Sequence, residues 1–139
     1  MIKSTVEEIE HTADWAIRVR AADLPGLFIA SAKGMFGLLA DLAQITICRH
    51  VSVELHAIDF ETLLIDWLNE LLYLSEQHGV IFVEFAVEEL SSGNDVSLRA
   101  HAAGGSPAEL FKVIKAATFS GLTIRRVDDA FQAELVFDV

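Results

Sequence analysis

The sequence predicts an α+β protein, a single domain (1–139) with two main helices packed on a mixed, largely antiparallel sheet. Two segments, about 23–39 and 59–78, repeat apolar residues at helical spacing behind an aspartate. Most of the remaining chain alternates apolar and polar residues in short runs separated by turn residues, as hairpin-linked strands do. The length of 139 residues fits one domain, and no stretch resembles a linker.

The first half of the chain predicts strand, helix and strand. Residues 15–21 alternate with a period of two, which indicates a half-buried strand. Asp23 can cap a helix that runs to about Leu39 and tolerates Pro25 in its first turn. Residues 45–57 then give the clearest alternation in the sequence and predict a second strand.

The second helix begins after Asp59, a residue type that caps helices, and ends at Gly79, the usual residue at a helix C-terminus. Residues 80–90 are apolar on both faces, which suggests a central strand. A turn at 91–95 predicts a hairpin with the strand that follows, 96–102.

The last third of the chain predicts three more strands. They cover roughly 111–119, 121–127 and 131–139, after a break at 104–107. Asp128 and Asp129 supply the turn before the last strand, whose apolar residues from Phe131 to Val139 are expected to face inward.

Composition excludes several classes of protein. The chain is 53% hydrophobic, but its longest apolar run, about 63–74, is interrupted by Asp66, Asn69 and Glu70 and is too short to cross a membrane. The first residues lack the regions of a secretory leader, and the one cysteine, Cys48, excludes an internal disulfide and fits a reducing compartment. We therefore expect a cytoplasmic protein with no membrane partner.

The charge is strongly acidic. Twenty-one acidic residues against ten basic ones give a net charge of −11. Proteins that grip RNA usually present a basic face, so we expect little direct RNA binding. An acidic surface instead suits cations or a basic protein partner.

No standard catalytic motif is present: the sequence has no phosphate-binding glycine loop, GxSxG, HExxH or CxxC. The five histidines show no metal-ligand spacing, and His50 and His56 fall on the polar face of a predicted strand, as solvated histidines do. A stand-alone hydrolase is therefore poorly supported, because no pair of nucleophile and base is evident.

Two acidic features invite a functional interpretation. The block EHTAD places His11 and Asp14 just before the first strand, where a turn bonded to local backbone is the structural alternative. At the other end, Asp138 and the carboxylate of Val139 lie side by side. Such oxygen ligands suit a hard cation such as Ca²⁺, and the alternative is a frayed, solvated tail.

Lys115 is the third feature. It alternates with Phe111, Val113, Ala117 and Phe119, so it falls on the apolar face of its predicted strand. A lysine there costs free energy unless its ammonium reaches water or a carboxylate. The sequence leaves two interpretations, an edge lysine that extends into solvent or a cation placed among acidic groups at a site.

Five blocks of this sequence resemble the archease family. They are His11–Asp14, Met35–Asp41, Asp66–Leu68, Lys115–Phe119 and Asp138. Each block is weak alone, but together they follow the family's order and spacing over nearly the whole chain. The chain departs at Trp15-Ala16, where archeases usually have valine-glycine, and at Phe119-Ser120, where they usually have tyrosine-histidine.

The resemblance implies an α+β fold with a divalent metal, expected to be Ca²⁺, as cofactor. The metal would be held by Asp14, Asp138 and Val139. His11 and Asp41 would be neighbours of that site, and Lys115 would be the family's essential lysine. The departure at Ser120 removes a histidine, and Trp15 could alter packing beside the metal.

The resemblance also implies a partner, a GTP-dependent RNA ligase of the RtcB type. An archease helps this ligase load guanylate and turn over repeatedly in tRNA splicing and RNA repair, and is a protein cofactor rather than an enzyme. The competing hypothesis is a chaperone-like modulator of a tRNA-modifying methyltransferase. The two differ on metal, since only the activator should need the carboxylate site.

Overall fold

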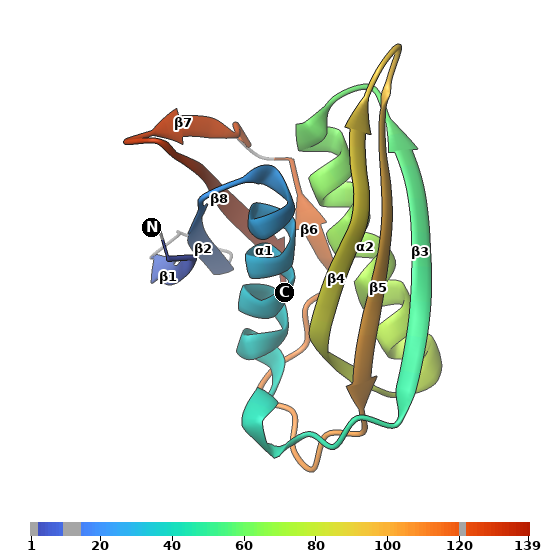
Figure 1. Cartoon of the computed structure of the whole chain (residues 1–139). Helices are drawn as coiled ribbons and strands as arrows, with labels where there is room; N and C mark the ends of the chain where they lie inside the picture. The colour runs from blue at the N-terminus through green and yellow to red at the C-terminus, as the bar shows by residue number, and fades with distance from the viewer. Residues whose placement is uncertain (1–2, 10–14, 120–121) are drawn as a thin grey trace.

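The computed structural model describes residues 3–9, 15–119 and 122–139 (Figure 1). In chain order the elements are β1 (Thr5–Ile9), β2 (Trp15–Ala21), α1 (Leu24–Leu39), the 3₁₀ turn η1 (Leu42–Gln44), β3 (Arg49–Ala57), α2 (Phe60–His78), β4 (Ile81–Ser92), β5 (Val96–Gly105), β6 (Ala116–Thr118), β7 (Arg125–Val127) and β8 (Ala130–Asp138). No helix among the described residues is long and apolar enough to cross a membrane.

The strands form two sheets, and the α+β class with two main helices is confirmed. The larger sheet has the order β1-β2-β8-β6, with β7 also paired to β8, and the smaller has the order β3-β5-β4. Every pairing among the described strands is antiparallel, so the prediction of a single, mixed sheet is wrong in these two details.

The helices explain why two sheets are needed. Figure 1 shows α1 between the larger sheet on the left and the smaller sheet on the right, and α1 contacts both β2 and β4. Helix α2 packs on β3 of the smaller sheet and on β6 of the larger one. Because α1 is apolar on most of its circumference, one sheet could not remove its side chains from water.

Both helix boundaries are confirmed by their caps. The Asp23 carboxylate accepts a hydrogen bond from the Gly26 amide at 2.7 Å, and the Asp59 carboxylate accepts one from the Thr62 amide at 2.8 Å. Gly79 ends α2 with φ of 65°, a left-handed conformation that favours glycine.

The core lies between the sheets and around the two helices. Its largest fully buried side chains include Trp67 and Phe28, and the Trp67 indole donates a hydrogen bond to the Phe28 carbonyl at 3.0 Å. Phe36 and Phe82 meet edge to face, with ring centroids 5.7 Å apart. The tryptophan of the block Asp66–Leu68 therefore has a structural role, because it packs in the core and makes one buried hydrogen bond between α2 and α1.

The prediction of a central strand at 80–90 is wrong, because β4 is an edge strand and β5 is central. Only the start of β4 is buried from both sides, where Ile81 and Phe82 enter the core. Two register shifts interrupt its pairing with β5, the first between Phe82 and Glu84. At this point Gly104 allows the backbones to approach, since a Cβ there would collide with the Ile81 carbonyl.

The predicted strands at 111–119 and 121–127 are also too long. Residues 106–115 are irregular, and only the short strands β6 and β7 form. The reason lies in the partner strand: β8 ends at Asp138, which pairs with Ala116, so the residues before Ala116 have no strand beside them. The final strand, in contrast, is confirmed as β8, and only Val139 departs from the predicted inward set, being 39% exposed.

Candidate functional site at the carboxyl end of β8

The register of the larger sheet brings Lys115 to the carboxyl end of the chain. In that sheet β8 lies between β2 and β6, where Trp15 pairs with Phe137 and Ala116 with Asp138. The Lys115 amide donates a hydrogen bond to the Asp138 carbonyl at 2.8 Å. Both side chains are exposed, so Lys115 and Asp138 are accessible to a partner where the start of β6 meets the end of β8.

Asn69 of α2 holds β6 at this edge. Its side-chain amide donates to the Ala117 carbonyl at 3.1 Å, and its side-chain oxygen accepts from the Ala117 amide at 2.8 Å. These two hydrogen bonds replace the ones that the backbone of a further strand would make with Ala117 of β6. Sequence reasoning missed this role, and the only signal was a polar residue within the apolar run at 63–74.

Lys112 fixes the segment before Lys115. Its ammonium lies over the ring of Trp15, a cation–π contact. Removal of water from around this ammonium lowers the pKa of Lys112, while the nearby Glu8 carboxylate acts in the opposite direction. Trp15 therefore has a specific partner in the segment that precedes β6.

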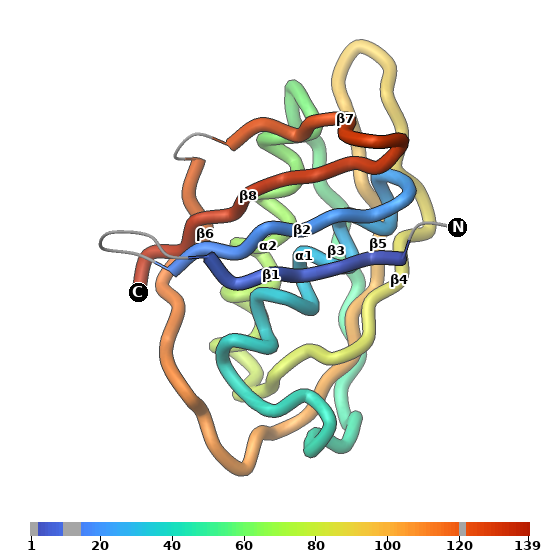
Figure 2. Tube along the Cα trace, turned by 90° about the vertical axis from the view of Figure 1, so that its left-hand side faces the viewer, coloured from blue at the N-terminus to red at the C-terminus, as the bar shows by residue number. Residues whose placement is uncertain are grey.

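The other predicted site residues are placed as follows. His11 and Asp14 lie outside the described residues, and Trp15 follows them directly. The Asp41 carboxylate accepts a hydrogen bond from the Ala43 amide at 3.2 Å and so caps η1. In both views the end of α1, drawn in turquoise, lies below the C terminus (Figures 1 and 2).

The donor atoms at this edge suit a hard cation. The Asp138 side chain supplies carboxylate oxygens, the ligand type that Ca²⁺ prefers. No ion pair between described residues involves Asp138 or Lys115. The described part of the chain holds no cluster of three or more His, Cys, Asp or Glu side chains placed for a metal.

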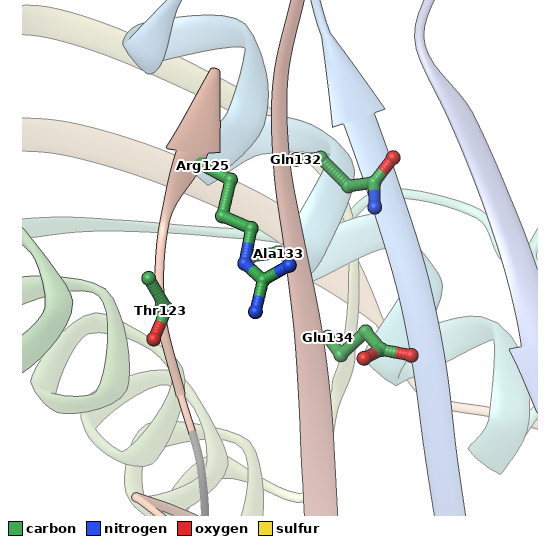
Figure 3. Close-up of a pocket in the computed structure, with 5 residues that line it drawn as sticks. All are labelled: Thr123, Arg125, Gln132, Ala133 and Glu134. Atoms are coloured by element: carbon green, nitrogen blue, oxygen red, sulfur yellow. The ribbon is translucent and has the colours of Figure 1, made fainter. Parts of the chain in front are cut away.

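A pocket lies elsewhere on β8, beside β7 (Figure 3). It is a small hollow open to solvent, and it is lined by Thr123, Arg125, Gln132, Ala133 and Glu134. The Glu134 carboxylate is paired with Arg18 at 3.0 Å. None of the predicted site residues lines this pocket.

A polar cluster covers part of the outer face of the smaller sheet. His101 hydrogen-bonds both Ser52, at 3.1 Å, and the Glu88 carboxylate, which also pairs with Arg99 at 3.2 Å. The hydrogen bond from His101 is the main reason that the pKa of Glu88 lies below its ordinary value. These contacts link neighbouring strands, and His50 and His56 are exposed as predicted.

Comparison with known proteins identifies the class of this fold. The model of the Archease protein family (MTH1598/TM1083) matches residues 7–139. An archease from Methanopyrus kandleri is 35% identical over 138 residues, covering 96% of this chain and 98% of the relative. One from Archaeoglobus fulgidus is 37% identical over 135 residues, covering 94% and 96%.

Solved structures share the fold. The solution structure of Methanobacterium thermoautotrophicum protein 1598 superposes with a TM-score of 0.81 at 24% identity, covering 96% of this chain and 98% of that one. A crystal structure of an archease from Thermotoga maritima, described as a possible chaperone, gives a TM-score of 0.55 at 21% identity and covers 94% of both chains. The chain belongs to the archease family, as its sequence blocks predicted.

Proposed function

We propose that this protein activates a GTP-dependent RtcB-type RNA ligase in the cytoplasm, promoting guanylylation and repeated turnover in tRNA splicing and RNA repair without being an enzyme itself. One observation supports the proposal: β6 pairs with the end of β8, and the Lys115 amide donates a hydrogen bond to the Asp138 carbonyl, so two exposed residues of opposite charge are neighbours along the backbone. Membership of the archease family supports it.

The chemistry of this edge suits a site that handles phosphate and metal. The Lys115 ammonium can pair with a phosphate oxygen of GTP or hold neighbouring carboxylates in register. Asp138, the Val139 carboxylate and Asp14 would hold a divalent cation, Ca²⁺ by donor type. When bound, that cation would supply positive charge beside the ligase's nucleotide. With a net charge of −11, the protein need not hold RNA itself.

The test is a titration of this protein into the ligase of the same organism, with GTP and divalent metal present. Guanylylation and multiple-turnover ligation should accelerate at substoichiometric amounts, because an activator is released and reused. Unchanged rates across the titration would overturn the proposal.

A chaperone-like modulator of a tRNA-modifying methyltransferase is the second candidate. It is favoured by exposed apolar residues such as Phe111 and Val113 and by the description of the Thermotoga maritima protein. Removal of divalent metal with a chelator distinguishes the two functions. Protection of the methyltransferase from aggregation should survive chelation, whereas ligase activation through the carboxylates should not.

A further inference from the structure

One row of side chains on the outer face of the larger sheet contains two arginines. Arg20 of β2 and Arg125 of β7 both pair with Gln132 of β8, one from each side. This row faces away from α1, because the neighbouring residue of β2, Val19, is buried on the side of α1. No ion pair between described residues involves either arginine. The row therefore carries local positive charge in a chain whose net charge is −11.

Both arginine side chains reach toward the middle of the row. Arg20 Nη2 donates a hydrogen bond to the Val127 carbonyl of β7 at 3.1 Å, so this side chain crosses β8, which lies between β2 and β7. Figure 3 shows the Arg125 guanidinium reaching β8 from the opposite side, beside Ala133. Arg20 Nε is buried and has no hydrogen-bond partner in the described part of the chain. The protein alone therefore leaves Arg20 incompletely satisfied, and a nearby anion would offset the cost of burying its charge.

Two neutral side chains complete the hollow beside Arg125 (Figure 3). They are Thr123, which precedes β7, and Gln132. A guanidinium, a hydroxyl and a side-chain amide can all donate hydrogen bonds. Because the hollow is small and open to solvent, it suits one compact anionic group that projects from a larger ligand or is free.

The acidic groups near the hollow are largely balanced by other residues. Glu134 lines the hollow, but its carboxylate pairs with Arg18 at 3.0 Å, and Arg18 also pairs with Glu7 at 3.3 Å. Asp128 and Asp129 belong to the turn between β7 and β8, beyond the row. The two glutamates and the three arginines of this face leave one positive charge in excess, 3 − 2 = +1.

We propose that this hollow binds a phosphate group, as the free anion or as the phosphate monoester of a nucleotide. A phosphate directs its oxygens in several directions and can accept hydrogen bonds from Arg125, Thr123 and Gln132 together. A carboxylate, in contrast, is satisfied by a single bidentate guanidinium. The hollow lies near the start of β8, whereas Lys115 meets Asp138 at its end, so this site is separate from the one proposed to act on the ligase.

The test is an NMR titration of the protein at constant ionic strength with inorganic phosphate, adenosine monophosphate, adenosine and acetate. Both phosphates should shift the amide signals of Gln132 and Ala133 in a saturable way. Arg125→Gln should weaken Kd by about tenfold, because it removes the charged donor. The matched control is Arg126→Gln, the same change on the same strand, since Arg126 lies over the Phe131 ring on the other face. It should change Kd by less than about twofold.

The four probes also identify the source of the phosphate. Tighter binding of adenosine monophosphate than of inorganic phosphate indicates a nucleotide, and equal affinity indicates the free anion; both results support the site. Equal binding of adenosine or acetate overturns recognition of phosphate. An absence of saturable shifts in the wild type, or an equal loss in Arg125→Gln and Arg126→Gln, overturns the proposal. Because Arg125 is exposed, its variant should keep the melting temperature of the wild type.

Discussion

The helical layer and the carboxyl-terminal edge use apolar residues in opposite ways. In α1 and α2 the periodic apolar residues are buried between two sheets, and Trp67 and Phe28 are fully enclosed. At the edge, Phe111 and Val113 follow an equally regular alternation but stay in solvent. The difference teaches that an apolar alternation alone does not determine whether the side chains are buried.

The two regions also differ in how their backbone is held. The helices are closed by the caps of Asp23 and Asp59 and by Gly79. Strand β6 is three residues long, and its outer side is bonded by the side chain of Asn69. The edge is therefore ordered by a few specific hydrogen bonds, while the helical layer is ordered by burial.

The sharpest contrast should be between Trp67→Ala and Phe111→Ala. Loss of the buried indole and its hydrogen bond should lower the free energy of unfolding by about 3–5 kcal/mol. Phe111→Ala should stay within about ±0.5 kcal/mol, because this ring contributes little burial. Urea unfolding of both variants checks this, and a similar loss in both would break the distinction between the regions.

Asn69→Ala should have an intermediate effect. It leaves the amide and carbonyl of Ala117 without their partners, at a cost of about 1 kcal/mol because water can replace part of the bonding. Hydrogen exchange of the Ala117 amide should accelerate, and ligase activation should fall because β6 positions Lys115. Glu76→Ala, an exposed change on the same helix, is the control. Unchanged exchange at Ala117 would show that Asn69 does not order the edge.

The smallest effect concerns Asp59, the N-cap of α2, and Asp66 within α2, whose pKa values are shifted in opposite directions. Hydrogen bonding to Thr62 lowers the pKa of Asp59 below 3.8, so its stabilisation is present above that pH and is lost as pH falls through the folded-state value. Burial raises the pKa of Asp66 above 3.8, so its charged form costs stability at neutral pH, and this cost disappears on acidification through the raised value.

Melting curves across pH should therefore separate two variants. Asp66→Asn should melt slightly above the wild type at neutral pH and lose that advantage on acidification. In Asp59→Asn the helix is still capped, but the side chain has no carboxylate to protonate. This variant should therefore lose less stability on acidification than the wild type. Parallel curves for the wild type and both variants would contradict these assignments.

Sequence patterns predicted the structural features that depend on residues close together in the chain. The capping residues and the helical spacing of apolar residues predicted where both helices begin and end. The alternation of apolar and polar residues predicted which side chains of the strands at 15–21 and 131–139 face inward. Alternation at 111–119 could not show that β8 ends at Asp138 and leaves residues before Ala116 without a neighbour. The contacts of Asn69 with Ala117 and of Lys112 with Trp15 join distant parts of the chain, so no local pattern reveals them.

The candidate site was predicted only in part from the residues. The adjacent carboxylates of Asp138 and Val139 suggested a cation, but their proximity to Lys115 depends on strand register, which the sequence does not state. Only the family resemblance predicted that these residues belong to one site. The roles of His11, Asp14 and Asp41 remain predictions, and the structure shows Asp41 as the cap of η1.

One comparison tests the central claim that this edge acts on a partner and contributes little to folding. Lys115→Ala, Asp138→Ala and the control Lys33→Ala are each measured for ligase guanylylation and for melting temperature with and without Ca²⁺. We expect the first two to lose activation while their unfolding free energies change by no more than about 0.5 kcal/mol, and the control to behave as the wild type. Ca²⁺ should raise the melting temperature of the wild type and not of Asp138→Ala. Full activation by Lys115→Ala and Asp138→Ala, with equal Ca²⁺ stabilisation, would contradict the account.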